Sequence, residues 1–260
     1  MKSKITEILN KADIRDVGFC AFDVIKDKLI ECRAKSRIPE NAKTVICCAF
    51  PYKVREEKPE NISRYAAVPD YHRILGGILK KSCDELKKYI DGYRYEYFVD
   101  NSPIPEVLAA SASGLGVIGK NGILITEKYG SFVFLGEIVT DLEIETVNKT
   151  KYCDNCGVCK TLCPVALDKK HCLSALSQKK GELDKSEQEL IYKNRIVWGC
   201  DICAEACPLN QGAELTYIKE FSDGYRSFYT DSEDITDRAY EWRGKKTVDR
   251  NFNIIKNFDR

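Results

Sequence analysis

The sequence predicts an α+β protein in three parts: a mixed α/β domain over residues 1–147, a cysteine-rich domain over 148–212 and a helical tail over 213–260. Three observations lead to this prediction. Segments of the first part alternate between helical apolar spacing and short apolar runs typical of strands. Eight of the thirteen cysteines fall between Cys153 and Cys207, and an amphipathic helical pattern follows them. With 43% apolar residues in 260, the chain is able to bury a sizeable core.

The individual elements of the first part follow from the apolar spacing. Periodicity near 3.6 predicts helices at 3–12, 70–90 and 105–113. Runs rich in β-branched and aromatic residues predict strands at 17–22, 44–50, 95–99, 122–126 and 131–140. We expect the last two strands to pair with each other across the turn at 128–130.

Charge and hydropathy exclude several classes of protein. The 41 Lys and Arg nearly balance the 40 Asp and Glu, so the chain as a whole is not a strongly basic nucleic-acid binder. No apolar run approaches the ~20 residues that cross a bilayer, and the first residues lack the apolar segment of a signal peptide. We therefore expect a cytoplasmic protein, whose cysteines serve as ligands or redox groups rather than disulfides.

The spacing of the eight clustered cysteines predicts two [4Fe–4S] clusters. The run Cys153-x2-Cys156-x2-Cys159-x3-Cys163-Pro164 is the bacterial ferredoxin pattern, in which the fourth cysteine ligates the other cluster. That rule requires a second ligand set, and Cys200-x2-Cys203-x3-Cys207-Pro208 supplies three of its members. Cys172 is the eighth ligand. The predicted sets are Cys153, Cys156, Cys159 and Cys207 for one cluster, and Cys163, Cys172, Cys200 and Cys203 for the other.

Zinc is the alternative for the clustered cysteines, because Cys-x2-Cys pairs also bind Zn²⁺. A four-cysteine zinc ribbon has no use for the Cys-Pro endings or the crossed fourth ligand, which favours iron–sulfur. The remaining cysteines have no metal spacing, and we interpret them as small apolar packing residues. They are Cys20, Cys32, Cys47, Cys48 and Cys83.

Residues 114–119 match the G-x-G-x-x-G fingerprint of dinucleotide-binding proteins. That fingerprint needs a strand before it and a helix after it, and here the predicted order is inverted. We therefore do not predict NAD binding. The glycines still indicate a tight turn, or a close backbone approach to a ligand, just before a strand.

With the cysteines placed, the chain resembles the epoxyqueuosine reductase family over roughly residues 10–215. That family comprises cobalamin- and iron–sulfur-dependent enzymes of tRNA queuosine synthesis. The resemblance rests on the eight cysteines and on five segments in a fixed order. These are Ile62-Ser-Arg-Tyr-Ala66, Asp70-Tyr71-His72, Phe98-Val-Asp100-x-x-Pro103, Gly114-Leu-Gly-x-Ile-Gly-Lys-Asn121 and Gly130-Ser-x-x-Phe-Leu-Gly-Glu137.

The resemblance implies a nitroreductase-like cobalamin domain followed by a ferredoxin-like domain with two clusters. It implies that an external one-electron donor of the ferredoxin or flavodoxin type feeds the clusters, which reduce cobalamin for removal of an epoxide oxygen. Cofactor contacts are expected from Ser174, Asp201, Gly116, Gly119 and Lys120. A solvated side chain remains the alternative for Lys120, and surface turn chemistry the alternative for Ser174 and Asp201.

The resemblance also implies that Asp100 is the proton donor. Phe98, Val99, Pro103 and Ile104 flank it, and such apolar shelter would raise the pKa of a carboxyl toward that role. The alternative is a strand-end aspartate that starts a turn or caps the helix at 105–113.

The two histidines are not expected to bind cobalt. We interpret His72 as a packing or hydrogen-bonding residue, and His171 as a solvent-facing neighbour of Cys172 or a group that supports it.

Three departures from the family pattern leave the substrate open. Val68-Pro69 replaces a Gly-Arg pair, Val117 replaces a tryptophan, and the chain lacks most of the helical-repeat domain that helps the family hold tRNA. The basic residues of 243–260 either touch phosphates or form a solvated helix face. Two alternative functions therefore stand beside epoxyqueuosine reduction in tRNA. One is a reductase of the same build with a small non-nucleic substrate, and the other is a two-cluster electron carrier without catalysis.

Overall fold

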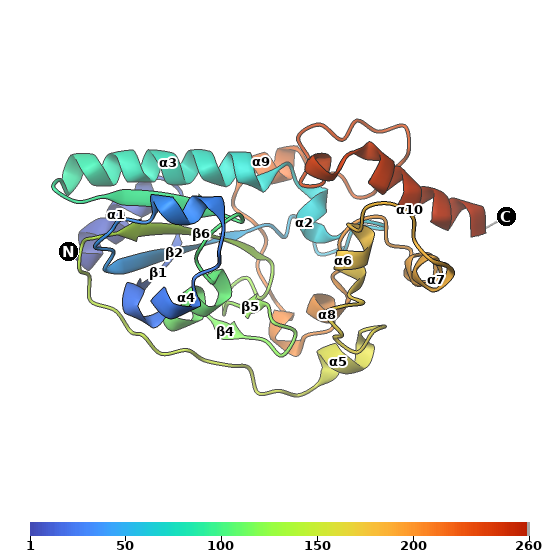
Figure 1. Ribbon diagram of the computed structural model, residues 1–260, viewed down its shortest axis with the longest axis horizontal. Coiled ribbons are helices and arrows are strands. Elements are labelled where there is room, and N and C mark those ends of the chain that lie inside the picture. The colour runs from blue at the N-terminus through green and yellow to red at the C-terminus, as the bar shows by residue number, and fades with distance from the viewer. Residues whose placement is uncertain (259–260) are drawn as a thin grey trace. The chain divides into compact units, whose positions relative to one another are not determined.

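The computed structural model describes residues 1–258 and folds into two compact units (Figure 1). Unit 1 comprises Met1–Pro51 and Tyr71–Asn155, and unit 2 comprises Tyr52–Asp70 and the chain from Cys156 onward. This division differs from the three predicted parts in three respects. Residues 52–70 leave the first part to join the cysteine-rich unit, residues 148–155 belong to unit 1, and the tail belongs to unit 2.

Unit 1 is an antiparallel sheet with helices on both faces (Figure 1). The strand order is β1-β2-β6-β3, and each neighbouring pair is antiparallel. The helices are α1 (Lys2–Lys11), α3 (Tyr71–Tyr89) and α4 (Glu106–Ala112). The strands are β1 (Asp16–Ala21), β2 (Thr44–Pro51), β3 (Tyr95–Val99), β4 (Val117–Ile118), β5 (Leu124–Ile125) and β6 (Val133–Thr140).

The two faces of the sheet explain the apolar composition of its central strands. Helix α3 packs on one face, where Gly136 leaves room for Leu79, since a Cβ at Gly136 would lie 2.7 Å from a Leu79 methyl carbon. Helix α4 packs on β1, β2 and β6 from the other face (Figure 1). Every residue of β2 is buried, as expected for a strand that is covered on both faces.

The predicted pairing of segments 122–126 and 131–140 is wrong. Strand β5 pairs instead with β4, and β6 lies between β2 and β3. Only one isolated bridge, Thr126 to Gly130, closes the turn between the two segments. Both edges of β6 are already filled by sheet partners, so no edge remains for β5.

The cysteines outside the ligand motifs confirm the packing interpretation in four of five cases. Cys20, Cys47, Cys48 and Cys83 are buried, and Cys32 is half-buried. Burial raises the pKa of the adjacent Cys47 and Cys48 thiols well above the usual range, so both are neutral packing groups.

Unit 2 is built of short helices around Trp198, which is fully buried. Residues 52–70 are held to it partly through Arg64, whose guanidinium pairs with Glu205 and donates to the carbonyl oxygens of residues 55–57. The helices are α2 (Arg64–Ala67), α5 (Val158–Leu162), α6 (Leu173–Ser177), α7 (Lys185–Asn194), α8 (Ile202–Glu205), α9 (Lys219–Asp223) and α10 (Lys245–Phe258).

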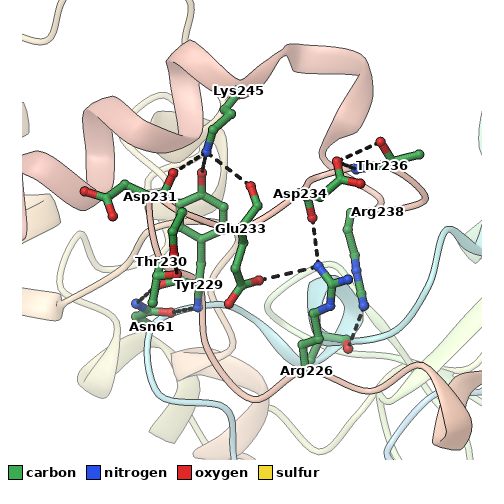
Figure 2. Close-up of polar contacts among 12 residues, drawn as sticks. Asn61, Arg226, Tyr229, Thr230, Asp231, Glu233, Asp234, Thr236, Arg238 and Lys245 are labelled. Carbon is green, nitrogen blue, oxygen red and sulfur yellow. Dashed lines mark hydrogen bonds and ion pairs between the residues drawn. The ribbon is translucent and has the colours of Figure 1, made fainter.

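The segment after residue 213 is not the mainly helical tail that the sequence predicts. Between α9 and α10 it is irregular apart from one short turn of 3₁₀ helix, Glu241–Arg243, and it is fixed by polar contacts (Figure 2). Lys245 Nζ donates to the hydroxyl of Tyr229 at 3.0 Å and to the carbonyl oxygen of Asp231 at 2.7 Å. Asn61 exchanges two hydrogen bonds with the backbone of Tyr229. These side-chain partners lie far apart in the sequence, so local periodicity does not reveal them.

Part of the basic tail is committed to internal contacts rather than phosphates. Arg250 donates to the carbonyl oxygens of Lys179 and Gly181, and Lys245 has the contacts given above. The neighbouring Asn251 is fully buried and donates to the carbonyl oxygens of Ser177 and Val197. These residues therefore anchor α10 within unit 2.

Asn251→Ala is expected to destabilise the protein. It leaves two carbonyl oxygens without their donor, at a cost of about 1–3 kcal/mol for a buried group that loses its partner. Urea unfolding of the holoprotein would measure the loss. Asn253→Ala on the exposed side of the same helix is the matched control, and it should be neutral or slightly stabilising because Ala favours helix. Equal midpoints for the two variants would contradict the anchoring role.

No helix within residues 1–258 is long and apolar enough to cross a membrane.

Candidate active site and cysteine sets

Asp100 stands immediately after β3, at a backbone position that few residue types tolerate. Its φ is +56°, in the left-handed region where Asp and Asn are the common non-glycine residues. The backbone N–H of Ser102 donates to the carbonyl oxygen of Asp100 at 2.6 Å, which closes a tight turn. The turn presents the carboxyl outward, and 59% of the Asp100 side chain is exposed.

Two residues at the start of α3 hold the Asp100 carboxylate. His72 Nε2 lies 3.2 Å from Asp100 Oδ2, and the Tyr71 hydroxyl also hydrogen-bonds the carboxylate. The Tyr71 ring stacks between His72 and Phe134, with centroid distances of 4.1 and 4.0 Å, which fixes the direction of both donors. The hydrogen-bonding interpretation of His72 is confirmed.

The expectation of a raised pKa at Asp100 is wrong. Hydrogen bonding and charge from His72 lower the pKa of this carboxyl, and the effect outweighs partial burial. The apolar neighbours in the sequence did not reveal these donors, because they come from a different helix. The helix-cap alternative is also excluded, since Pro105 is the residue that precedes α4 and no side chain caps it.

Two further carboxyls lie behind Asp100, and the sequence predicted a role for neither. Glu106 is the first residue of α4, and its carboxyl accepts a hydrogen bond from the backbone N–H of Asp100. Glu137 on β6 is 1% exposed and accepts a hydrogen bond from the Ser102 hydroxyl at 3.2 Å. Glu137 is the single charged residue of an otherwise apolar predicted strand. A buried charge of that kind is the signal that could have revealed it.

Burial makes Glu106 and Glu137 much weaker acids than Asp100. It raises the pKa of Glu106 to about 8, with the negative charge of Asp100 as the next cause, and it raises the pKa of Glu137 well above the usual range. Asp100 and Glu106 line one hollow of about 380 Å³, together with Ser102, Ile104 and other apolar residues. At neutral pH the hollow therefore holds one ionised carboxylate beside a neutral carboxylic acid.

The glycine-rich motif forms the β4–β5 hairpin of unit 1. A Cβ at Gly116 would lie 2.3 Å from the Ile125 carbonyl oxygen, and one at Gly119 would lie 2.4 Å from Asn121 Oδ1. The close approach that these glycines permit is therefore to their own hairpin. Their predicted contact with a cofactor stays a prediction.

The same hairpin holds the first cysteine of the ferredoxin-like run. The backbone N–H of Lys120 donates to Cys153 Sγ at 3.3 Å, and the N–H of Cys153 donates to the Ile118 carbonyl oxygen at 3.0 Å. This contact gives Lys120 a place beside a predicted cluster ligand, through its backbone rather than its side chain.

Unit 2 contains every clustered cysteine except Cys153, and a pair of its short helices brings the two runs together. Helices α5 and α8 pack against each other, and they carry Cys159 and Cys203 respectively (Figure 1). Each helix is followed by a Cys-Pro pair. This arrangement suits the exchange of the last ligand between two clusters.

A second group of cysteines gathers around Cys200. The thiols of Cys172 and Cys203 are near enough to Cys200 to influence its ionisation, and these three belong to one predicted ligand set. Gly199 precedes Cys200 with φ +69°, and a Cβ there would lie 2.0 Å from Ser63 Oγ, so only glycine suits this position.

All thirteen cysteines are free. Within the described chain, no three His, Cys, Asp or Glu side chains converge on a single metal ion.

The remaining predicted residues lie in unit 2. Asp201 Oδ2 accepts a hydrogen bond from the backbone N–H of Arg64 at 2.6 Å, and burial raises the pKa of Asp201 to about 6. Ser174 is half-buried on α6, where Gln178 approaches its hydroxyl. His171 is 64% exposed and pairs with Asp168 at 2.7 Å, which confirms the solvent-facing interpretation.

The known proteins that resemble this chain in both sequence and fold are oxidoreductases. A family model described as "Epoxyqueuosine reductase QueG, DUF1730" matches residues 33–101. The epoxyqueuosine reductase of Lactococcus garvieae is 30% identical in an alignment that covers 96% of this chain and 85% of the relative. The chain therefore belongs to the epoxyqueuosine reductase family. It spans 58% and 48% of the relatives from Gloeobacter violaceus and Salmonella typhimurium, which are 38% and 34% identical.

Solved structures share the fold over nearly the whole chain. The epoxyqueuosine reductase of Streptococcus thermophilus has a TM-score of 0.80 at 26% identity, covering 98% of this chain and 80% of that one. An epoxyqueuosine reductase with an epoxyqueuosine-modified tRNA-Tyr stem loop has a TM-score of 0.81 at 24% identity, with the same coverage. The Bacillus subtilis enzyme, with an aspartate-containing catalytic loop swung out of the active site, has a TM-score of 0.80 at 24% identity and the same coverage. The mixed α/β prediction is confirmed at this level.

Proposed function

We propose that this protein reduces epoxyqueuosine to queuosine in tRNA by removing the epoxide oxygen. Family membership supports the reaction, and the relative with a bound tRNA stem loop supports tRNA as the substrate. A tRNA substrate would place the activity in the cytoplasm. The observation that carries the proposal is the carboxyl site of unit 1, where Asp100 follows a strand end and lines a hollow.

In this proposal Asp100 protonates the departing oxygen. A carboxyl that is exposed, held in one orientation by His72 and Tyr71, and seated on a fixed turn is suited to transfer a proton to a bound substrate. The Bacillus subtilis relative has a catalytic loop that contains an aspartate, which supports an active-site position for an aspartate after β3 here. An electron carrier without catalysis would have no need of this arrangement.

The eight clustered cysteines suit two [4Fe–4S] clusters with the partition predicted from their spacing. The packing of α5 on α8 and the grouping of Cys172, Cys200 and Cys203 support that partition. An external one-electron donor of the ferredoxin or flavodoxin type would reduce the clusters. This assignment goes with a ferredoxin-like architecture for residues 148–212 and a nitroreductase-like architecture for residues 1–147.

The proposal includes cobalamin because the family resemblance implies it. When bound, cobalamin would supply the electrons that break the carbon–oxygen bond. Of the residues expected to contact the corrin, four make contacts within their own units: Gly116, Gly119, Lys120 and Asp201. Ser174 remains a proposed contact. The steps assigned to Asp100 do not depend on these residues.

Anaerobic reaction of the reconstituted holoprotein with epoxyqueuosine-containing tRNA tests the function. Nucleoside analysis should show loss of epoxyqueuosine and gain of queuosine. A parallel reaction with the free epoxyqueuosine nucleoside separates the substrates, because a tRNA enzyme should convert it much more slowly. Equal conversion of both would favour a reductase of small substrates. Cluster reduction without conversion of either would favour the electron carrier.

A further inference from the structure

Removal of an epoxide oxygen as water, leaving an alkene, consumes two electrons and two protons. This inference rests on the proposed function, in which a ferredoxin- or flavodoxin-type donor supplies the electrons one at a time. Asp100 by itself is a poor source of protons, because His72 and Tyr71 stabilise its ionised form and lower its pKa. Its carboxylate must therefore receive a proton before each transfer.

Glu106 is placed to supply that proton. Its carboxyl accepts a hydrogen bond from the Asp100 backbone N–H, and the two side chains line the same hollow. Glu106 Oε1 is buried and has no hydrogen-bond partner among the described residues. An unpartnered buried carboxylate oxygen is costly, whereas the neutral acid avoids most of that cost.

The groups around Glu106 favour the same protonation state. Asp100 faces it with a negative charge, and Glu137 lies behind it on β6, close enough for the two acids to repel when ionised. His72 on α3 has the opposite effect and lowers the pKa of Glu106, but this is the weakest of the influences on it. On β2, Cys47 is the strand partner of Glu137 and Cys48 follows it, and both thiols are neutral because burial raises their pKa well above the usual range. The surroundings thus keep Glu106 protonated and Asp100 ionised. Active sites commonly give two acids different pKa values in this way, so that one donates a proton and the other accepts it.

We infer that Glu106 is a positioning residue that holds the proton which Asp100 delivers to the substrate. In each transfer the O–H bond of the Glu106 acid breaks and an O–H bond forms on the Asp100 carboxylate, directly or through one water molecule. Asp100 then gives this proton to the departing oxygen and becomes a carboxylate again. Glu106 takes a new proton from solvent, and two such cycles balance the two electrons.

The test is the pH profile of single-turnover epoxide reduction by pre-reduced holoprotein. The wild-type rate should be flat below about pH 8 and fall above it, because Glu106 loses its proton there. Glu106→Gln should be slower by about 10²-fold at pH 7. Its rate should rise about tenfold for each unit of decrease in pH, because Asp100 must then be protonated directly and its own pKa is low.

The matched control is Glu127→Gln, which removes an exposed glutamate from the same unit. It should keep the wild-type rate and profile. Glu106→Asp retains a carboxyl and should keep a plateau with a lower maximal rate. A Glu106→Gln variant that is slower by one factor at every pH, with the break near pH 8 intact, would show a purely structural role and overturn the inference.

A second readout is independent of turnover. Infrared difference titration should detect a carboxylic acid C=O band that disappears near pH 8 in the wild type and in Glu127→Gln, and is missing from Glu106→Gln. Its presence in all three proteins would overturn the inference. If epoxyqueuosine is not converted at all, the proposed function fails, and this titration still reports whether Glu106 holds a proton.

Glutamine reproduces the size of the neutral acid, so Glu106→Gln should fold. The wild-type acid is protonated in the native state at pH values where the unfolded state has already ionised. Its stability relative to the variant should therefore decrease as the pH rises from about 4.5 to about 8. Denaturant unfolding at several pH values would measure this trend, and the two stability curves running in parallel would contradict it.

Discussion

Asp100→Asn is expected to lower the rate of epoxide reduction by about 10²–10⁴-fold, or roughly 3–5 kcal/mol in activation free energy. The substitution removes the transferable proton and little else. Asn adopts the left-handed backbone of this position about as readily as Asp, and it still offers an oxygen to His72. Single-turnover conversion with pre-reduced holoprotein is the measurement, because it removes electron delivery from the comparison.

The control for Asp100→Asn is the state of the cofactors. Iron content, cluster spectra and cobalamin binding should match those of the wild type, because Asp100 belongs to neither ligand set. A wild-type rate in this variant would return Asp100 to the status of a turn residue. It would also remove the main argument against the electron-carrier alternative.

Cys207→Ser is expected to remove one of the two clusters. The reconstituted wild type should contain about eight iron and eight sulfide per chain, and the variant about four of each. Iron and sulfide analysis after anaerobic reconstitution checks this. Cys32→Ser is the control, since Cys32 is half-buried and has no metal spacing, and it should retain the full content. One zinc without sulfide in the wild type would contradict the ferredoxin interpretation.

Double substitutions test which cysteines share a cluster. Cys156→Ser combined with Cys207→Ser should lose no more iron than either single change, because both residues are assigned to one cluster. Cys200→Ser combined with Cys207→Ser should lose nearly all of it. Residues that act as one unit are non-additive in this way. The opposite pattern would show that the last ligand is not exchanged between the runs.

Local periodicity predicted most of the secondary structure. Strand β3 coincides with the predicted segment 95–99, and α1, α3 and α4 lie within a residue or so of their predicted bounds. Each of these elements has an apolar pattern that is complete within its own length. The cysteine motifs are likewise local, because neighbouring ligands in the sequence wrap one cluster.

Contacts between distant segments were not available from such patterns. The pairing of β5 with β4 depends on which sheet edges remain open, and the attachment of residues 52–70 to unit 2 depends on Arg64 and its partner Glu205. The segment between α9 and α10 was expected to be helical, yet polar contacts such as those of Lys245 hold it in an irregular form.

In the candidate site, too, local features were predictable from the sequence and contacts between distant segments were not. The sequence by itself determined the cysteine spacing, the position of Asp100 after a strand and the resemblance that predicts a proton-donor role for it. Only the tertiary structure decided the acidity of the site, because it brings His72 from α3 against Asp100 and buries Glu106 and Glu137 behind it. A pKa depends on burial and on nearby charges in space, and neither is encoded in the residues next along the chain.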